Sequence, residues 1–517
     1  MLFNSSVFLY VFLPLSLLGF YMVARLAGIS AAKVWLCAAS FVFYGWWNPI
    51  FLVLLVGSIT FNYALSVFLT DRPGARGQTL LLSVGVAANV LLLAYFKYLF
   101  PFLGFLHELG LRHADAGSVV LPLGISFFTF TQIGYLVDCR QGVVRERGLL
   151  NYVLFVTFFP HLIAGPILHN REIMPQFADP RIYVFKAANL AAGLALFAFG
   201  LFKKVVFADS IAPWAELGFM HTQGMPWLQS WSVALGYSMQ LYFDFSGYSD
   251  MAIGLGIMFG VKLPLNFNSP YKASSIIDFW QRWHMTLTRY LTLLIYNPIS
   301  LWIARRRKAQ GLGTGRDAAA SPGGFVSMIA FPTMVTMLIA GVWHGAGFTY
   351  FVFGALHGTY LCINHAWRLA FPPRPRGEVA PSRTVLMRVW CVFWPVALTY
   401  LAVLVTEIFF RAASVSDALA LLRGMLGLNG GAPSLPLDAK LRDNLLLGVG
   451  LAIIAFGAPN AYQIMNEWSP TLTKVRSTLR SVWQWRPNLG WAMVGGLLLF
   501  VASQRFDQSA VFLYFQF

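Results

Sequence analysis

The chain has 517 residues, of which 58% are hydrophobic and only 11% are charged. Soluble domains carry about 25% charged residues, so this composition excludes a protein whose whole surface meets water. The formal net charge is +17, but the basic residues form short clusters between apolar runs and no nucleic-acid-binding motif occurs, so nucleic acid is not an expected partner.

Apolar runs recur along the chain, and with their flanking residues they approach the length of about 20 residues that crosses a bilayer as a helix. We expect an all-α, polytopic transmembrane helical bundle of about eleven to thirteen membrane helices, some of them re-entrant, in one domain over residues 1–517. No basic segment or cleavage site accompanies the first run, so it is expected to be a retained helix. The runs cover residues 7–23, 50–69, 80–95, 190–207, 325–339, 389–404 and 445–456.

The basic clusters predict an orientation, because cytoplasmic loops of membrane proteins are enriched in Lys and Arg. Placing them in the cytoplasm puts both Met1 and the C-terminus outside. Residues 305–324 then form a mobile cytoplasmic loop, residues 371–388 a cytoplasmic linker and residues 412–443 the longest external loop. The clusters are Arg25 with Lys33, Arg72 with Arg76, Arg140 with Arg145 and Arg147, residues 305–308, Arg374 with Arg376, and Lys474 with Arg476 and Arg480.

The four cysteines, Cys37, Cys139, Cys362 and Cys391, are scattered along the chain. They show neither the spacing of a disulfide framework nor that of metal ligands. We therefore expect four packing residues and no metal site.

Ionisable side chains inside a bilayer are costly, so those embedded in apolar segments are candidates for function. The first is His161, in the string Phe-Pro-His-Leu-Ile-Ala-Gly-Pro that ends at Pro166. The prolines and the glycine interrupt an apolar run. Either a broken helix lies beside a cavity, or a kinked helix lets His161 bond a nearby carbonyl group.

Asp244 and Asp250 form the second candidate cluster, in the string Leu-Tyr-Phe-Asp-Phe-Ser-Gly-Tyr-Ser-Asp. Carboxylates in such apolar surroundings need hydrogen-bond donors or a protonated state. We expect their partners to be hydroxyl groups, amide hydrogens or a buried histidine. Structural scaffolding is the first expected role, and orientation of a catalytic group is the second.

The stretch that follows combines a helix start with a histidine among tryptophans. Ser275 and Asp278 have the spacing of an N-terminal capping arrangement. A helix from that point would stack Trp280, His284 and Thr288 on one face. His284 would then face a cofactor channel or serve as part of an interfacial aromatic anchor.

His344 is the third candidate, because glycines surround it in the string Gly-Val-Trp-His-Gly-Ala-Gly from Gly341 to Gly347. Glycines allow the backbone to bend and another chain or a substrate to come close. A neutral imidazole in a low-dielectric site suits a general base that takes a hydroxyl proton. A core histidine is the alternative. A second His-Gly step follows at His357.

Several motifs are missing from the sequence. It contains no G-x-S-x-G elbow, no phosphate-binding G-x-x-x-x-G-K-[ST] loop and no H-E-x-x-H pair. Serine hydrolase, NTPase and zincin activities are therefore not expected.

Taken together and in this order, several strings resemble the membrane-bound O-acyltransferase family, and within it the bacterial alginate O-acetyltransferase group. They run over nearly the full length. They are Phe3-Asn-Ser-Ser-Val-Phe-Leu, Phe41-Val-Phe-Tyr-Gly-Trp-Trp, Leu121-Pro-Leu-Gly-Ile-Ser-Phe, Phe159-Pro-His-Leu-Ile-Ala-Gly-Pro, the stretch from Asp244 to His284, Trp343-His344-Gly, and Phe512-Leu-Tyr-Phe-Gln-Phe.

The resemblance implies a bundle that encloses a funnel or tunnel, in the inner membrane of a bacterium. The near-invariant family histidine corresponds to His344 in Trp-His-Gly, and a second one to His284 in Phe-Trp-x-x-Trp-His. It further implies that no cofactor is bound permanently and that the acyl donor is a cytoplasmic thioester such as acetyl-CoA. The implied partners are the lipid bilayer, periplasmic acetyltransferase proteins and a polysaccharide acceptor.

Our hypothesis is that His344 acts as general base on a hydroxyl group while His284 positions the thioester or stabilises its developing oxyanion. The supporting residues would be Trp343, Asp244, Asn266, Trp280, Trp283 and His161. A transporter or flippase that exports a polymer or an acylated carrier is the alternative, because broken apolar segments and intramembrane carboxylates also suit transport.

Overall fold

The computed structural model describes residues 1–71, 77–111, 119–144, 146–372, 384–429, 440–477, 479–506 and 512–513. Over these ranges the regular structure is helical and no strand occurs, as the composition predicts. The chain groups into two compact units. Unit 1 comprises Met1–Asp209, Phe243–Asn266 and Pro459–Gln516, and unit 2 comprises Ser210–Tyr242 and Phe267–Ala458. That the two make a single domain stays a prediction.

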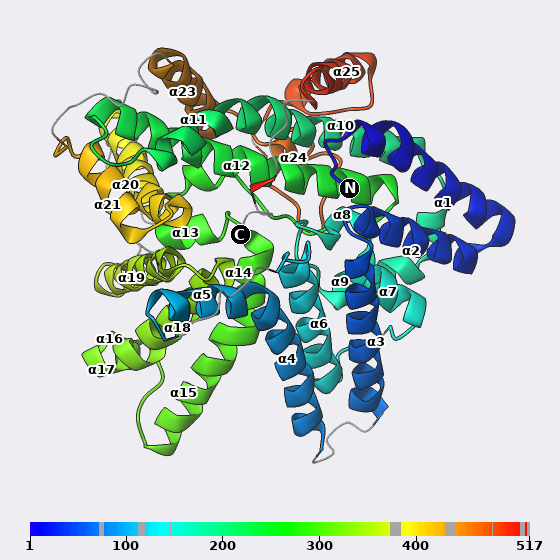
Figure 1. The fold of residues 1–517 in the computed structure, drawn as a ribbon, viewed down its shortest axis with the longest axis horizontal. Helices are drawn as coiled ribbons and strands as arrows, with labels where there is room; N and C mark the ends of the chain where they lie inside the picture. The colour runs from blue at the N-terminus through cyan, green and yellow to red at the C-terminus, as the bar shows by residue number, and fades with distance from the viewer. Residues whose placement is uncertain are drawn as a thin grey trace. The chain divides into compact units, whose positions relative to one another are not determined.

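Unit 1 holds the N-terminal helices and the C-terminal ones, and it shares α12 (Trp227–Met258) with unit 2 (Figure 1). Its π-helical and 3₁₀ turns are η1 (Phe8–Phe12), η2 (Tyr95–Leu99), η3 (Pro180–Tyr183), η4 (Lys203–Ala208) and η8 (Ser481–Trp483). Its α-helices are α1 (Leu13–Ala27), α2 (Ile29–Gly45), α3 (Ile50–Asp71), α4 (Gln78–Ala94), α5 (Phe100–Glu108), α6 (Ile125–Arg140), α7 (Leu149–Thr157), α8 (Phe159–Leu162), α9 (Asn170–Ala178), α10 (Ala187–Phe202), α24 (Ala461–Ile464) and α25 (Leu489–Ser503).

Unit 2 begins within α11 (Asp209–Met220) and holds the helices of the second half of the chain. Its shorter turns are η5 (Pro270–Lys272), η6 (Thr292–Tyr296) and η7 (Val326–Ala330). The other helices are α13 (Ile276–Trp280), α14 (Met285–Leu291), α15 (Asn297–Ala309), α16 (Arg316–Ala320), α17 (Pro322–Phe325), α18 (Phe331–His344), α19 (Phe348–Ala370), α20 (Val385–Arg411), α21 (Val415–Met425) and α23 (Leu441–Gly457).

The apolar runs of the sequence all lie in helices, which confirms the predicted fold class. Among the described residues, six helices are long and apolar enough to cross a membrane, and two further apolar helices, α2 and α25, are shorter. The larger predicted number of membrane helices includes re-entrant pieces and stays a prediction. The six are Phe8–Ala27, Ile50–Thr70, Gln78–Glu108, Ala187–Met220, Pro322–His344 and Trp390–Arg411.

Two predicted loops are helical for part of their length. Residues 305–324 include the end of α15 and all of α16, so the expectation of a mobile loop is wrong there. Residues 412–443 include α21, whose first turn is capped because the Ser414 side chain accepts a hydrogen bond from the Asp417 amide at 3.1 Å. The Gly-rich and Pro-rich composition beyond α21 hid this capping signal. Residues 430–439, and residues 373–383 of the predicted linker, lie outside the described part of the chain.

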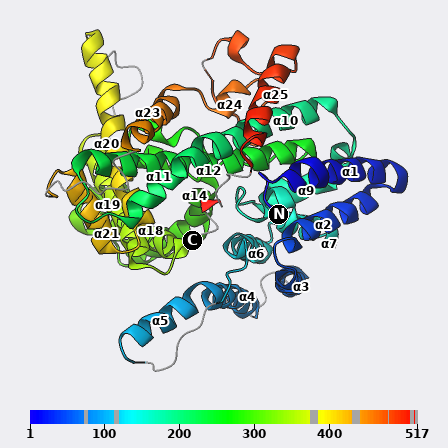
Figure 2. The ribbon, with the colours of Figure 1, turned by 45° about the horizontal axis from the view of Figure 1, so that its top comes forward.

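The four cysteines are free thiols. Cys37 and Cys139 are buried and Cys362 is half-buried, as expected of packing residues. Cys391 is exposed on α20, so the packing role predicted for it is wrong. Its helix, yellow in Figure 2, exposes several large apolar side chains over the same stretch, as a helix in contact with lipid does.

An apolar hollow of about 810 Å³ lies in unit 1, between α1, α10 and α25. Leu, Phe, Tyr, Met and Pro side chains line it, together with Ser503. None of the predicted site residues lines this hollow, and no ionisable acid, base or histidine does. Its lining is therefore that of a surface compatible with lipid.

Two pairs of glycines bring α10 and α12 into close contact within unit 1. A Cβ atom on Gly200 would lie 2.5 Å from the Gly247 carbonyl oxygen, and one on Gly247 would lie 2.7 Å from that of Gly200. Gly193 and Gly254 form a second reciprocal pair at 2.6 and 2.7 Å. Both partners of each pair must lack a side chain, because each faces the other helix's backbone.

Replacing Gly247 with Leu should therefore force α10 and α12 apart. Overpacking a close helix contact costs about 1–3 kcal/mol, so we expect a lower midpoint of thermal unfolding in detergent. Gly57→Leu is the matched control, because Gly57 also lies on an apolar helix of unit 1 and nothing would stand within 4 Å of its Cβ. Equal unfolding midpoints for the two variants would contradict the proposed close packing.

Candidate functional site

α13, the helix that carries Trp280, is much shorter than predicted. α13 starts as expected, with the Ser275 side chain accepting a hydrogen bond from the Asp278 amide at 3.2 Å. It ends at Trp280, and α14 starts only at Met285. The predicted stacking of Trp280, His284 and Thr288 along one continuous helix is therefore wrong.

The break lies at His284, which adopts a left-handed backbone conformation with φ 40° and ψ 52°. Residues other than glycine rarely adopt it, and it costs about 1–3 kcal/mol, so it persists only where the surroundings fix it. The His284 carbonyl accepts a hydrogen bond from the Thr288 amide at 3.0 Å, and this bond opens α14. His284 lies outside the six candidate membrane spans. Burial lowers the pKa of His284 to about 3, so its imidazole is neutral near pH 7.

His344 is the last residue of α18, and the glycines around it allow α19 to pack closely against this end of the helix. A Cβ atom on Gly341 would meet the Tyr350 carbonyl oxygen, and one on Gly345 would meet the Tyr350 ring. The glycines therefore allow close contact with another segment, as the sequence predicts, and that segment is α19 (Figure 1). The His344 side chain is buried and packs edge-on against Phe410, with ring centroids 4.9 Å apart.

Both histidines of the hypothesis lie in unit 2, and both pack against the same indole. The Trp343 ring centroid lies 6.5 Å from that of His284 and 4.7 Å from that of His344. All three side chains are buried. The structure thus gathers two segments about 60 residues apart in the chain around Trp343, although neither capping nor helix periodicity predicts this meeting.

Trp283 is held by aromatic rings on several sides. It stacks on Phe279 at 5.7 Å and on Tyr271 at 6.3 Å, with planes nearly parallel in both pairs, and it meets Phe267 edge-on at 5.0 Å. Since Trp283 directly precedes His284, these rings fix the turn from the N-terminal side. This observation fits the supporting role predicted for Trp283.

A buried polar cluster behind Tyr271 was missed by the sequence reasoning. The Tyr271 hydroxyl donates to Glu407 Oε1 at 2.9 Å, and the Ser238 hydroxyl donates to Tyr271 at 3.0 Å. The Tyr400 hydroxyl in turn donates to the Ser238 hydroxyl at 3.0 Å. Glu407 is a buried acid inside the candidate membrane span Trp390–Arg411 of α20, just beyond the apolar run 389–404, and this signal alone marks it as a candidate.

Asp244 belongs to an ion-paired cluster of unit 1. Its Oδ1 lies 2.6 Å from Lys204 Nζ, which also lies 2.7 Å from Asp209 Oδ1. The backbone amide of Leu513 donates to Asp244 Oδ2 at 2.9 Å. All three charged side chains are buried. Asp244 thus ties α12 to η4 and to the C-terminal segment, as the scaffolding role requires.

Asp250 pairs in the same way with Lys203, whose Nζ lies 2.6 Å from Asp250 Oδ2. For both aspartates we expect hydroxyl, amide or histidine partners. The Leu513 amide confirms this for Asp244, whereas the lysine partners of both aspartates contradict it. The lysines begin η4, directly after α10 and inside the predicted apolar run 190–207, where the sequence alone does not show which groups they pair with. Asn266, also in unit 1, is buried and donates to the Ser249 hydroxyl at 3.2 Å.

His161 lies in the short helix α8, at the predicted interruption of an apolar run. α7 ends at Thr157 and the chain is again irregular from Ile163 to Leu168. Burial lowers the pKa of His161 to about 3, and a hydrogen bond with the Phe155 carbonyl works in the opposite direction. The carbonyl contact corresponds to the kinked-helix alternative. His161 belongs to unit 1, whereas His284 and His344 belong to unit 2.

Within the described ranges, no group of three or more His, Cys, Asp or Glu side chains could hold a metal ion. The chemistry open to the gathered side chains of unit 2 is that of two buried imidazoles and their aromatic surroundings. Imidazoles take and give protons and hydrogen-bond developing charge, as acyl transfer requires.

Comparison with known proteins gives the class. Residues 128–314 match the membrane-bound O-acyltransferase family, a stretch that contains His284 and ends before His344. The chain is 36% identical to a peptidoglycan O-acetyltransferase of Helicobacter pylori, over 100% of this chain and 98% of that protein. It is 34% identical to the probable alginate O-acetylase AlgI of Pseudomonas putida, over 100% of both. A teichoic acid D-alanyltransferase of Bacillus subtilis is 28% identical over 49% of this chain and 61% of its own length.

These matches define a polytopic membrane protein of the acyl-transferring class. The chain belongs to the membrane-bound O-acyltransferase family, and it is an enzyme that transfers an acyl group to a hydroxyl.

The ion-paired cluster of unit 1 makes a direct prediction. Lys204→Met leaves two buried carboxylates without their shared cation, and removing one partner of a buried ion pair costs about 3–5 kcal/mol. We expect a large drop in the thermal unfolding midpoint in detergent, partly restored by adding Asp244→Asn. Arg181→Met, which breaks an exposed ion pair with Asp179, should change the midpoint little. Similar midpoints for Lys204→Met and Arg181→Met would contradict a structural role for the cluster.

Proposed function

We propose that the enzyme takes an acetyl group from a cytoplasmic thioester, with acetyl-CoA as the donor, and passes it across the membrane for O-acetylation of a cell-surface polysaccharide. The observation that carries this proposal is the packing of His284 and His344 against Trp343. It brings two imidazoles, both of which can be neutral, into one buried, apolar region. Such surroundings strengthen hydrogen bonds to a developing charge.

In the proposed step, His344 takes the proton of the acceptor hydroxyl as its oxygen attacks the thioester carbonyl carbon. A carbon–oxygen bond forms, the carbon–sulfur bond breaks, and the thiolate leaves and is protonated. His284 hydrogen-bonds the carbonyl oxygen as negative charge develops on it. Trp343 packs against both imidazoles, while Asp244 and Asn266 support the fold of unit 1.

The acceptor is proposed from the names of the relatives. The names of these relatives give peptidoglycan, alginate and teichoic acid as the polymers they act on. All three polymers carry free hydroxyls and lie outside the cytoplasm. Our first candidate is an alginate-like exopolysaccharide. Peptidoglycan is the second, because the relative named for it matches this chain over essentially its whole length.

The place and the partners of the reaction are also proposals. We place the enzyme in the bacterial inner membrane with its C-terminus in the periplasm, as the basic clusters favour. The acceptor hydroxyl of the proposed step then belongs either to the polymer itself or to a periplasmic acetyltransferase protein, which passes the acetyl group on to the polymer.

His344→Ala should abolish acetyl transfer in correctly inserted protein, because loss of a general base lowers the rate by about 10² to 10⁴. His284→Ala should lower kcat more than it raises KM for the donor, since it acts on the developing charge. The measurement is transfer of radiolabelled acetyl from acetyl-CoA in membranes. His221→Ala, an exposed histidine of unit 2, should behave as wild type. Normal transfer by His344→Ala would refute its role as base.

Deleting the gene should lower the acetyl content of one polymer only. We expect loss of acetyl from the secreted exopolysaccharide, restored by wild-type protein and not by His344→Ala. Acetyl released by mild alkali from purified exopolysaccharide and from purified peptidoglycan gives the measurement. Loss from peptidoglycan alone would select the second candidate, and unchanged acetyl in both polymers would contradict a polysaccharide acceptor.

A further inference from the structure

His357 lies on α19 with 1% of its surface exposed, and both of its ring nitrogens are hydrogen-bonded. The indole Nε1 of Trp280 lies 3.2 Å from His357 Nδ1, and the Thr406 hydroxyl lies 2.9 Å from His357 Nε2. One imidazole thus joins three helices of unit 2, namely α13, α19 and α20.

The partners determine which nitrogen carries the proton. An indole N–H only donates, so His357 Nδ1 must accept and carries no hydrogen. The Thr406 hydroxyl donates its hydrogen to the Val403 carbonyl at 2.6 Å, so toward His357 its oxygen accepts. Both contacts therefore require the neutral tautomer with hydrogen on Nε2. α19 is not one of the six candidate spans, and burial lowers the pKa of His357 to about 3, in agreement with a neutral ring near pH 7.

Since both nitrogens are committed, His357 has no free site for proton transfer. Its ring instead stacks parallel to Phe279 of α13 at 6.1 Å and meets Phe353 edge-on at 4.6 Å. Phe353 in turn packs edge-on against the ring of His344 at 5.7 Å. The contacts of His357 thus reach both segments of the candidate site.

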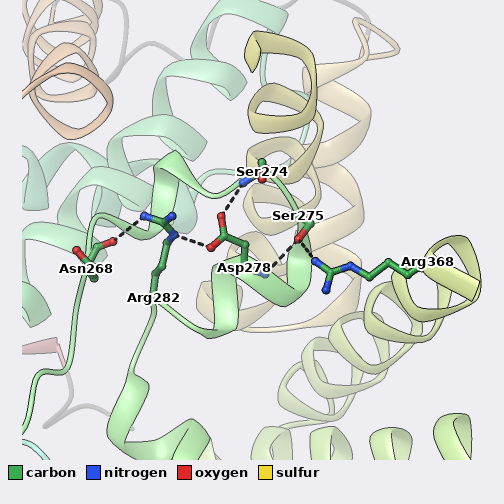
Figure 3. Close-up of polar contacts among 6 residues, drawn as sticks. All are labelled: Asn268, Ser274, Ser275, Asp278, Arg282 and Arg368. Carbon is green, nitrogen blue, oxygen red and sulfur yellow. Dashed lines mark hydrogen bonds and ion pairs between the residues drawn. The ribbon is translucent and has the colours of Figure 1, made fainter. Parts of the chain in front are cut away.

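α13 has only five residues, so it depends on neighbours for its position. Besides the His357 contact, Arg368 of α19 donates to the Ser275 hydroxyl at 3.3 Å, at the other end of α13 (Figure 3). His357 and Arg368 are eleven residues apart, which is about three helical turns, so they lie on the same face of α19.

The turn after α13 is closed by a second set of contacts. Arg282 Nε donates to Asp278 Oδ1 at 2.7 Å and Arg282 Nη1 to the Asn268 carbonyl at 3.4 Å (Figure 3). The Asn268 amide donates to the Arg282 carbonyl at 2.9 Å. With α13 anchored to α19 at both ends, the turn places His284 only four residues after the Trp280 anchor.

We propose that His357 is a positioning residue: as a neutral Nε2–H imidazole it holds Trp280, and through α13 it fixes the turn that carries His284 beside Trp343. The inference rests on the proposed function, because His284 is assigned a role in acyl transfer there. The Trp280 bond is the part that matters for position, whereas the Thr406 bond secures the orientation of the ring.

Two isosteric amides separate the two bonds. His357→Asn offers an acceptor near the Nδ1 position for Trp280, and His357→Gln offers a donor near the Nε2 position for Thr406. We expect His357→Asn to keep kcat within about threefold, and His357→Gln to lose on the order of 10- to 100-fold in kcat with little change in KM, because small misplacements in a reactive site have effects of that size.

A second pair of variants changes the two hydrogen-bond partners of His357 and leaves His357 itself unchanged. Trp280→Phe removes the indole donor and should reproduce the loss in kcat, whereas Thr406→Val removes the other partner and should keep kcat within about threefold. Adding His357→Gln to Trp280→Phe should cause no further loss, since both variants remove the same bond. Equal kcat for the Asn and Gln variants, equal kcat for Trp280→Phe and Thr406→Val, or fully additive losses would overturn the inference.

Hydrogen exchange of the backbone amides of residues 276–288, measured in detergent, provides a readout that does not depend on turnover. Exchange should accelerate in His357→Gln and Trp280→Phe, and not in His357→Asn or Thr406→Val. If wild-type protein transfers no acetyl while exchange follows this pattern, the proposed function fails and the positioning contact stands. If wild type is active and exchange is alike in all four variants, the positioning role fails alone.

Discussion

The structure depends on one constraint, which is that polar groups buried in an apolar interior must be paired. A bilayer offers no water to satisfy them, so every buried charge or imidazole must find its partner within the protein. In unit 1, Lys204 meets two aspartates and the Leu513 amide completes the shell of Asp244. In unit 2, Glu407 and His357 are each held by hydroxyl or indole groups. Partner requirements of this kind link helices that are distant in sequence.

The candidate site of unit 2 shows how such pairing creates geometry. Aromatic rings supply most of the contacts around His284 and His344, and rings alone pack without strong orientation. The few directional bonds, from Trp280 to His357 and from Tyr271 to Glu407, therefore determine where the rings stand. Because each of these bonds is buried, breaking one leaves an unsatisfied polar group, and the arrangement is held more firmly than its small number of bonds suggests.

Sequence reasoning succeeded where a signal is local. Apolar runs gave the helices, Ser275 and Asp278 gave the start of α13, and the glycines around His344 gave a close approach. It failed where partners are distant. Nothing near Lys203 or Lys204 shows that they pair with aspartates some 40 residues later, and nothing near Tyr271 points to Glu407. Around α21 the two local signals predict different structures. The Gly-rich and Pro-rich composition that follows predicts a loop, whereas the Ser414 cap predicts the start of a helix, and the structure is helical.

The left-handed conformation of His284 explains why the predicted continuous helix would not give the same arrangement of side chains. In a helix, residues four apart lie on one face, so His284 would point the same way as Trp280, whose indole is bonded to His357. The φ of 40° at His284 ends that alignment and starts a new helix. Its ring then lies 6.5 Å from Trp343, next to the end of α18. Because strain of this kind persists only where surrounding contacts fix it, the bonds that anchor α13 and the stacked rings around Trp283 are what allow two histidines from separate segments to share one indole.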